Sequence, residues 1–398
     1  MFHKIAVDMF PNSRPPKVLF AGANHWQNCI HVGSHHLAKA FRALGFEVFY
    51  LSDPLSPFHA LGVNRSEFMQ KFRSTTVLRD SESGVQFLTP FSLLTPNTFP
   101  ISNTRTIMQH WWRLCIPPLK RTFITREFVE VDILYLESPR YHFLLDILEY
   151  KKSVFRVADK SSGFPGHTEI HGFAERKIAR NADLTIYSAS LLKTYVEELG
   201  ATNTLHVPNG VDYDHIVSGE HQPVPVEYQT LSGPKFLYIG AMAEWFDFDL
   251  VANAATHIPE GNFILIGPSE MAKSRLGHLP NVHILGRRSF ADIPAYLWNA
   301  DVGMIPFNVN KYPELIDSVN PLKLYEYMAA KLPVVSVMWR ELELLASPAC
   351  LTSSSAEFVQ GLREAVTLSP ASSNQKYAKT KTWDNGVLEI LQRLHNQS

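Results

Sequence analysis

The chain has 398 residues, of which 45% are hydrophobic and 19% charged, a composition typical of a folded protein with two or more domains. The 37 basic and 38 acidic residues leave a formal net charge of −1, which excludes nucleic-acid binding through bulk positive charge. The three cysteines, Cys29, Cys115 and Cys350, are widely spaced, which excludes a disulfide scaffold and a cysteine-based zinc module.

The first ten residues lack the apolar stretch of a signal peptide, and no run of about 18 apolar residues long enough to span a bilayer occurs. The low cysteine content also suits a reducing compartment. We therefore expect a cytoplasmic protein.

The first half alternates short apolar runs with amphipathic helices, the pattern of a parallel sheet covered by helices. Residues 17–22 predict a strand, and Ser34 is a plausible N-cap of a helix that stops at Gly45, before a strand at 47–51. The segment 54–130 is rich in Pro, Ser, Thr and aromatic residues and shows no clear periodicity. Further strands are predicted at 132–136, 153–157, 184–188 and 204–210, with a helix at 190–199.

A second series of elements follows an aperiodic segment at 213–234, which we interpret as a linker. Strands are predicted at 235–240, 262–267, 282–286, 301–306 and 333–337. Helices are predicted at 247–257, 290–299, 321–330, 355–367 and 383–395. The sequence thus predicts an α/β protein with two doubly wound parallel sheets.

Such sheets bind ligands beyond the carboxyl ends of their strands. Glycines end four of the predicted strands: Gly22, Gly240, Gly267 and Gly286. Without a Cβ atom these positions let the backbone approach a ligand, although glycines also end strands for local reasons. Neither a GxGxxG nor a GxxxxGK[ST] motif occurs, so neither a dinucleotide fingerprint nor a P-loop is indicated.

The segment 318–330 carries the most site chemistry. Asn320 can cap a helix whose positive end points beyond the strands, and Lys323 and Glu326 are three residues apart on one face of it. An ammonium group at that end suits a phosphate, and a carboxylate suits two sugar hydroxyls. A surface ion pair between the two side chains is the alternative.

Several of these segments resemble the GT-B glycosyltransferases of family four. Residues 205–212 (Leu-His-Val-Pro-Asn-Gly-Val-Asp) are similar to that family's interdomain signature, and 320–335 to its nucleotide-sugar helix and following strand. The resemblance covers most of 155–340 and residues 17–51. It implies the GT-B fold, in which two Rossmann-like doubly wound domains face each other across a cleft. The implied parts are an acceptor domain at 1–212, a linker at 213–234, a nucleotide-sugar domain at 235–380 and a helix at 381–398 expected to pack toward the N-terminal domain.

The chain departs from the family pattern at the donor site. Many members carry Arg and Lys shortly after the first strand of the second domain, where residues 240–247 have neither. Ser318 replaces the first of two glutamates, of which Glu326 is the second, and Lys331 stands where glycine is common. The pair Arg287-Arg288 either replaces the missing diphosphate cations, meets a sugar carboxylate or forms a solvated basic loop; Arg287 and Arg288 are therefore candidate donor residues.

In these respects the chain is more similar to the bacterial glucuronosyltransferase that builds xanthan. That enzyme has methionine at the position of Met242 and an aromatic residue at that of Phe307, which implies that both border the base or ribose of the donor. It has a Met-Lys pair at the positions of Leu322 and Lys323, which are likewise expected at the donor site.

The same similarity implies a catalytic role for Asp159, which follows the strand at 153–157. The matching position of the xanthan enzyme carries the proposed general base, which takes the proton of an acceptor hydroxyl. That role implies inversion at the anomeric carbon; capping of the following turn is the alternative. Gly22, Asn24 and His25 follow the first strand and are expected on the acceptor side.

Two segments leave alternatives open. His167, Glu169 and His171 are close in sequence but do not form HExxH, and because GT-B enzymes generally need no metal we expect neither metal nor cofactor. Residues 110–126 interleave aromatic with basic side chains, which indicates either a membrane-interface patch beside a lipid-linked acceptor or core aromatics flanked by surface charge.

The resemblance implies an enzyme that moves a sugar from a UDP-sugar, with UDP-glucuronate as one candidate, to a glycan or lipid-linked acceptor in bacterial surface polysaccharide synthesis. A peripheral contact with the inner face of the membrane would accompany a lipid-linked acceptor. The alternatives are a nucleotide-sugar epimerase of the same architecture, a retaining family-four transferase and a non-catalytic sugar-binding protein.

Overall fold

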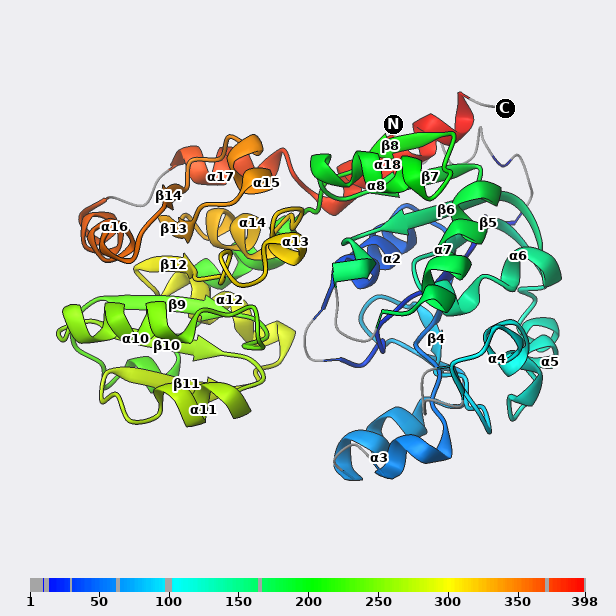
Figure 1. Cartoon of the computed structure of the whole chain (residues 1–398), viewed down its shortest axis with the longest axis horizontal. Helices are drawn as coiled ribbons and strands as arrows, with labels where there is room; N and C mark the ends of the chain where they lie inside the picture. Colours follow the sequence, from blue (N-terminus) through cyan, green and yellow to red (C-terminus); the bar gives the residue numbers. More distant parts are fainter. Residues whose placement is uncertain are drawn as a thin grey trace.

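Two α/β domains lie side by side in the computed structural model (Figure 1). The structure describes residues 10, 14–28, 31–61, 65–96, 102–163, 167–368 and 372–396. Cys29 and the first nine residues, which bear on the expectations about cysteines and a signal peptide, lie outside these ranges. Within the described ranges, no helix is both long and apolar enough to cross a bilayer.

The N-terminal domain contains a sheet with the strand order β3-β4-β2-β1-β5-β6-β7-β8, parallel except for the β3–β4 pair. Its strands are β1 (Lys17–Ala21), β2 (Glu47–Leu51), β3 (Leu78–Arg79), β4 (Gln86–Leu88), β5 (Glu130–Leu136), β6 (Glu149–Val157), β7 (Leu184–Tyr187) and β8 (Thr204–His206). Its helices are α2 (Gly33–Ala43), α3 (Arg65–Arg73), α4 (Arg105–His110), α5 (Leu119–Thr125), α6 (Leu144–Ile147), α7 (Glu169–Asn181) and α8 (Lys193–Glu198).

Both faces of this sheet are buried. Successive side chains of a strand point to opposite faces, and in β1 Val18 and Phe20 join one apolar cluster while Leu19 and Ala21 join another. The continuous apolar run at 18–21 follows from this two-sided burial and explains why the strand could be predicted.

The start of α2 differs from the expectation that Ser34 caps it. The helix begins at Gly33 with Val32 as the N-cap. Ser34 lies inside the first turn, where its Oγ is 3.1 Å from the hydroxyl oxygen of Tyr50 on β2. The polar side chain is therefore used in a buried contact rather than at the helix end.

The C-terminal domain contains a fully parallel sheet with the order β11-β10-β9-β12-β13-β14. Its strands are β9 (Lys235–Ile239), β10 (Asn262–Ile266), β11 (Val282–Gly286), β12 (Val302–Ile305), β13 (Val334–Val337) and β14 (Cys350–Thr352). Its helices are α9 (Tyr213–Val217), α10 (Phe248–His257), α11 (Glu270–Leu276), α12 (Ile293–Trp298), α13 (Pro313–Ile316), α14 (Leu322–Ala329), α15 (Arg340–Leu344), α16 (Ser355–Thr367) and α17 (Ser372–Lys379).

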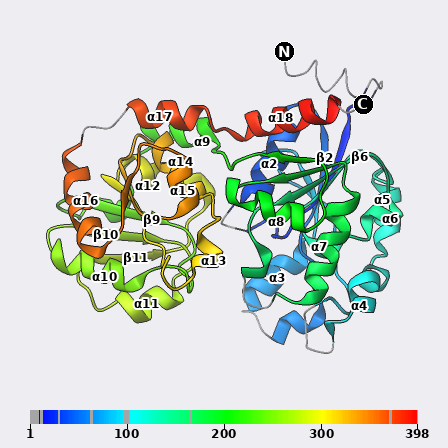
Figure 2. The ribbon, with the colours of Figure 1, turned by 45° about the horizontal axis from the view of Figure 1, so that its top comes forward.

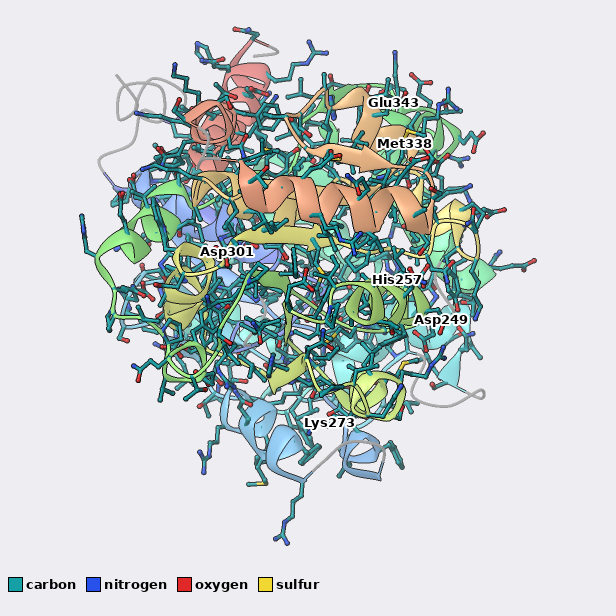
Figure 3. All side chains as sticks on the ribbon, turned by 90° about the vertical axis from the view of Figure 1, so that its left-hand side faces the viewer. Asp249, His257, Lys273, Asp301, Met338 and Glu343 are labelled. Carbon is teal, nitrogen blue, oxygen red and sulfur yellow. The ribbon has the colours of Figure 1, made fainter. Side chains whose placement is uncertain are left out.

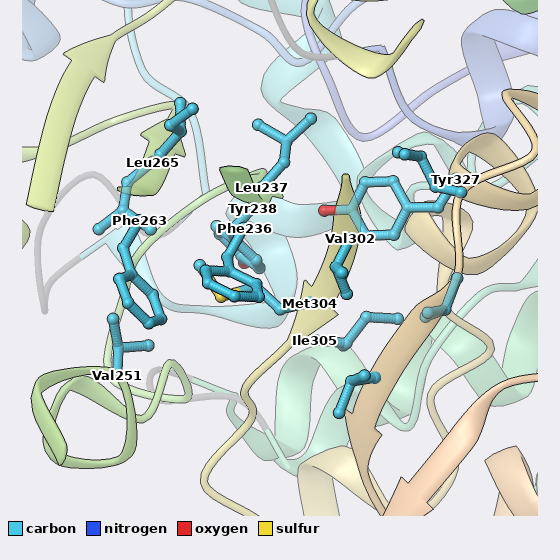
Figure 4. Packing of buried hydrophobic residues seen from close by; sticks show 14 of the residues in the cluster. Phe236, Leu237, Tyr238, Val251, Phe263, Leu265, Val302, Met304, Ile305 and Tyr327 are labelled. Carbon is cyan, nitrogen blue, oxygen red and sulfur yellow. The ribbon is translucent and has the colours of Figure 1, made fainter. Parts of the chain in front are cut away.

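The core of this domain packs helices against the central strands (Figure 4). Phe236 on β9 and Phe263 on β10 lie with their ring centroids 4.9 Å apart. Tyr327 reaches the sheet from α14, and its hydroxyl accepts a hydrogen bond from the backbone of Ile239 at 2.9 Å. This bond fixes α14 against the carboxyl end of β9.

The far side of the C-terminal domain is covered by polar side chains (Figure 3). Asp249, His257 and Lys273 are exposed there, and Asp249 pairs with Arg275 at 2.8 Å. Exposed ion pairs of this kind contribute little to stability. The face has the character of an ordinary solvated surface.

The expected linker at 213–234 is an ordered part of the C-terminal domain. It forms α9 and two short 3₁₀ turns, and Ile216 and Tyr228 join the core of that domain. The indole nitrogen of Trp298 donates to the carbonyl of Ile216 at 2.6 Å. Isolated buried side chains at irregular spacing leave no periodic pattern, which is why the sequence resembles a linker.

The last described helix, α18 (Trp383–His395), returns to the N-terminal domain and packs against α2 (Figure 2). Its apolar side chains belong to the same cluster as those of α2 and β1: Trp383, Val387, Ile390, Leu391 and Leu394. A parallel bridge between Val211 and Thr382 joins the two chain segments that connect the domains.

We expect Leu391→Ala to lower the free energy of unfolding by about 2–5 kcal/mol, because Leu391 is 1% exposed and its removal leaves a cavity. Denaturant unfolding followed by circular dichroism measures the change. Glu389→Ala, at an exposed position of the same helix, should shift stability by no more than about 0.5 kcal/mol. Equal stability of the Leu391 and Glu389 variants would contradict the packing of α18.

Candidate active site

The strand ends of both sheets lie at the contact between the domains. The side-chain nitrogen of Asn209 donates to the carbonyl of Asn320 at 2.7 Å. Across the same contact, the buried Glu341 carboxylate accepts hydrogen bonds from the backbone amides of Ser190 at 2.8 Å and Leu191 at 3.1 Å. These bonds hold the domains together. One cavity lies between the domains and a second lies in the N-terminal domain; following the expectations from the sequence, we call them the donor cavity and the acceptor cavity.

The donor cavity has a volume of about 80 Å³ and is lined by His31, Ile239, Gly240, Ile266, Gly267, Arg287, Arg288, Phe290, Ile293, Leu322, Lys323 and Glu326. The structure thus brings together five predicted donor residues: Arg287, Arg288, Leu322, Lys323 and Glu326. Small-molecule sites usually measure roughly 300–1,000 Å³. A ligand of that size would fit only if the domains separated or the lining side chains moved.

Lys323 lies in the first turn of α14, over the end of β9. Gly240 has φ 151°, and a Cβ atom there would come within 2.4 Å of Cε of Lys323. Glycine is therefore needed at position 240 because the Lys323 side chain fills the space where a Cβ atom would be. The sequence analysis expected a ligand in this space. Nζ lies 5.2 Å from the ring centroid of Tyr238 and 5.5 Å from that of Phe307.

The Lys323 ammonium group has no hydrogen bond or ion pair with any residue that the structure describes, so the alternative of a surface pair with Glu326 does not hold. Burial lowers the pKa of Lys323, and the nearby Glu326 opposes this shift. Burial raises the pKa of Glu326, which Lys323 opposes and Asp212 reinforces. Burial thus destabilises the charged form of both side chains. An anion beside Lys323 or a hydroxyl group beside Glu326 would offset this cost.

Arg288 is already engaged. Its guanidinium donates to Glu227 at 2.5 Å, to the Tyr296 hydroxyl at 2.8 Å and to the carbonyl of Leu285 at 2.6 Å. It therefore builds the cavity wall with its charge neutralised, whereas Arg287 is exposed.

Met242 and Phe307 do not line the donor cavity. They are 3% and 5% exposed and belong to the core of the C-terminal domain. Phe307 lies next to Lys323, and Met242 packs further inside. Their expected contact with the base or ribose stays a prediction.

The acceptor cavity lies in the N-terminal domain and has a volume of about 560 Å³. Its lining includes Asp159 and Asn24, together with Ala23, Glu137, Pro139, Arg140, Phe155, Arg156, Val157, Ala158, Ser161, His167, His171 and Glu175. Of the other residues expected on this side, Gly22 is covered by the Tyr50 hydroxyl, which a Cβ atom would meet at 2.0 Å. His25 lies beside Thr89, with Nδ1 3.2 Å from Oγ1.

Asp159 follows β6 and is half-buried in the wall of this cavity. Within the described part of the chain its carboxylate accepts no hydrogen bond and forms no ion pair, and in particular it caps no turn. Burial raises the pKa of Asp159, Arg156 opposes the shift and Glu137 adds to it. A free carboxylate with a raised pKa that faces a cavity has the properties of a general base.

Arg156 and Glu137 line the acceptor cavity together with Asp159. The Arg156 guanidinium donates to Glu137 at 3.1 Å and to the side-chain oxygen of Asn209 at 2.7 Å. Since Asn209 also bonds to Asn320, a chain of hydrogen bonds runs from the acceptor cavity to the residues that precede α14.

His167 and His171 line the acceptor cavity with their ring centroids 5.8 Å apart. His167 Nδ1 is 3.2 Å from Oγ of Ser161, which donates to Glu175 at 2.6 Å. Across the described ranges, no group of three or more His, Cys, Asp and Glu side chains is arranged to hold a metal ion.

Sequence reasoning missed several lining residues. Glu137 directly follows β5, so the rule that ligands bind at strand ends would have found it. Arg156 lies inside a strand, where a charged residue in an apolar run is the signal. His31 belongs to no element, and only its position just before α2 indicates a role.

Two family models match the chain, one in each domain. Residues 20–188 match the model described as glucuronosyltransferase GumK, N-terminal domain. Residues 233–367 match the model described as glycosyl transferases group 1.

One curated relative is TuaH of Bacillus subtilis strain 168, which is named for glycosyltransfer in teichuronic acid biosynthesis. It is 30% identical over 218 residues, which make up 51% of this chain and 54% of the relative. The match thus spans about half the length of that protein.

Solved structures share the fold over almost the whole chain. A sucrose-phosphate synthase from Thermosynechococcus elongatus has a TM-score of 0.68 at 15% identity, covering 96% of this chain and 98% of its own. Anabaena HepE, in complex with UDP and glucose, has a TM-score of 0.64 at 16% identity, covering 96% and 100%. The chain thus has the GT-B fold of two Rossmann-like domains, and each domain matches one of these two glycosyltransferase family models.

Proposed function

We propose that the protein transfers a sugar from a UDP-sugar to a hydroxyl group of a glycan or lipid-linked acceptor in bacterial surface polysaccharide synthesis. The observation that carries this proposal is the pairing of a free Asp159 carboxylate in one domain with a free Lys323 ammonium group in the other. The UDP complex of HepE and the teichuronic acid name of TuaH support the donor and acceptor classes.

The residues divide the reaction between them. Lys323 would face the diphosphate at the positive end of α14, Arg287 would meet a carboxylate of the sugar, and Glu326 would accept hydrogen bonds from the sugar hydroxyls. As the acceptor oxygen bonds to the anomeric carbon, the bond from that carbon to the phosphate oxygen breaks and its electron pair leaves with UDP. Asp159 takes the acceptor proton. Attack from the side opposite the leaving group inverts the anomeric configuration.

For the donor sugar we favour glucuronate. Arg287 is exposed at the rim of the donor cavity, where a guanidinium group suits a sugar carboxylate. The N-terminal match to a glucuronosyltransferase supports this choice. The proposal uses no metal ion or cofactor.

A donor screen tests the proposal. The purified protein is incubated with UDP-glucuronate, UDP-glucose or UDP-galactose and a membrane-glycolipid extract, and release of UDP is followed. We expect UDP release that depends on the extract and is fastest with UDP-glucuronate. UDP release or an epimer without acceptor would favour the epimerase, and UDP binding without turnover on any donor would favour a sugar-binding protein.

The surface around α4, α5 and the 3₁₀ turn at Trp111–Leu114 supports a peripheral membrane contact. Its exposed side chains are Arg113, Leu114, Ile116, Lys120, Arg121 and Ile124, which we call the basic-apolar patch. Trp111 is 1% exposed and donates to the carbonyl of Arg140 at 3.1 Å, so this tryptophan belongs to the core. Aliphatic side chains flanked by cations suit the interface of an anionic membrane.

We expect the protein to float with vesicles that contain phosphatidylglycerol and to be released by high salt. Ile124 is 65% exposed, and Ile124→Asp should weaken vesicle binding by about tenfold because it removes an apolar contact and adds a repelled charge. Leu368→Asp, at a 60% exposed position in the other domain, is the matched control and should bind normally. Equal vesicle binding by both variants would show that the basic-apolar patch does not contact the membrane.

A further inference from the structure

We infer that His31 donates a hydrogen bond from the N-terminal domain to the sugar-bearing phosphate of the donor, opposite Lys323. The inference rests on the proposed function and adds a residue to the leaving-group site. It assigns to the N-terminal domain a part of the diphosphate contact that the sequence comparison placed wholly in the C-terminal domain.

The first observation is position. His31 lines the donor cavity together with Lys323, Glu326 and Arg287, although it precedes α2 in the other domain. The acceptor hydroxyl would approach from the N-terminal domain, so the phosphate that carries the sugar is the part of the donor nearest to that domain. A group of the N-terminal domain in this cavity is therefore placed at the bond that breaks.

The second observation is an unused nitrogen. Nδ1 of His31 is buried and has no hydrogen-bond partner in the described structure. Buried polar atoms are nearly always paired in native proteins, so an unpaired nitrogen on a residue that lines a cavity calls for a partner. A phosphate oxygen in the donor cavity would supply one.

The third observation is a fixed ring. The imidazole of His31 stacks on Phe290 at 4.6 Å between centroids and on His35 at 5.2 Å. The stack on His35 lies within the N-terminal domain and does not depend on how the domains meet, so it limits the orientations of the ring and reduces the entropy lost when it binds a ligand.

His31 acts as a neutral donor. Burial, and to a smaller extent the charges of His35, Lys39 and His215, lower its pKa to about 3. The titratable groups around it lie on both domains: His35, His36 and Lys39 on α2, His215 on α9, and Arg287, Arg288, Lys323 and Glu326 in the cavity. The neutral imidazole still carries one N–H, which donates to the phosphate without proton transfer.

This contact would compensate for the absence of Arg and Lys at 240–247. Arg288 is held by Glu227 and offers no replacement. Negative charge grows on the phosphate as the bond to the sugar breaks, so an N–H aimed at that oxygen binds the transition state more tightly than the ground state.

The test compares UDP with UMP by calorimetry, because UMP lacks the second phosphate. His31→Phe keeps a ring on Phe290 but removes the N–H, and His31→Gln restores an N–H without the ring. We expect His31→Phe to weaken UDP binding about tenfold and UMP binding less than about twofold, and to lower turnover by at least tenfold. His31→Gln should recover part of both losses.

His215→Phe is the matched control, since His215 also stacks on Phe290, at 4.1 Å, but does not line the cavity. It should bind UDP like the native protein. Native UDP affinity in His31→Phe, or an equal loss for UMP and UDP, would overturn the inference. A native protein that binds no UDP would instead overturn the proposed function, before any variant is made.

Discussion

Asp159→Asn is expected to lower turnover by about 10²–10⁴-fold while the affinity for UDP barely changes. A sugar hydroxyl is a weak nucleophile near neutral pH until its proton is removed, and the asparagine keeps the size of Asp159 without the basic oxygen. UDP release with native and variant protein measures turnover, and calorimetry measures affinity. Asp159 lies in the acceptor cavity and the residues expected to bind the nucleotide lie in the other domain. Turnover should therefore fall while UDP affinity stays the same.

The pH profile of the native protein gives a second check on Asp159. Because burial raises its pKa, the carboxylate is protonated, and unable to act as a base, at a higher pH than an ordinary aspartate. The rate should be full above this raised pKa and should fall as the pH drops through it. This fall of the rate at low pH should be absent in Asp159→Asn.

Glu175→Gln is the matched control in the same cavity, because Glu175 already accepts hydrogen bonds from Ser161 and Tyr195. It should cost far less turnover than Asp159→Asn. Proton NMR of the product should show an inverted anomeric centre. A retained centre would reduce Asp159 to a positioning role, and near-native turnover of Asp159→Asn would remove it from the mechanism.

Lys323→Ala is expected to weaken UDP binding by about 1.5–3 kcal/mol, or roughly 10–150-fold, because it removes a cation that meets a charged oxygen. Calorimetry measures the loss. Lys331→Ala is the matched control, since Lys331 lies just beyond the other end of α14, where it pairs with Glu220 at 3.2 Å. It should leave UDP affinity unchanged. A folded Lys323→Ala protein with native affinity would exclude Lys323 from the donor site.

The four central strands of the C-terminal domain could be predicted because they are largely buried and therefore mostly apolar, as in β10 (Asn262–Ile266). The segment 54–130 could not be resolved into elements, since β3 and β4 have only two and three residues. Strands this short leave no alternation to recognise.

The positions of Asp159 and Lys323 beside cavities could be predicted because both residues obey the rule for strand ends and helix starts; their roles stay predictions. His31 escaped the rule because its position depends on how the two domains meet, which no local pattern records. The comparison with the family, in which glycine is common at the position of Lys331, also pointed to the backbone conformation there. Its φ of 62° is a left-handed conformation that glycine adopts without strain, which explains why glycine is common at that position.

The return of α18 to the N-terminal domain has a consequence for synthesis on the ribosome. Val387, Ile390 and Leu394 complete a core whose other members lie near β1 and α2, so the whole C-terminal domain is made between the two parts. The domain that emerges first is therefore finished last, and its apolar face over α2 stays open to water or to a chaperone until α18 arrives. A stop codon after residue 212 would release an N-terminal domain with an incomplete core, whereas a fusion of that domain to residues 383–396 through a short flexible loop should fold.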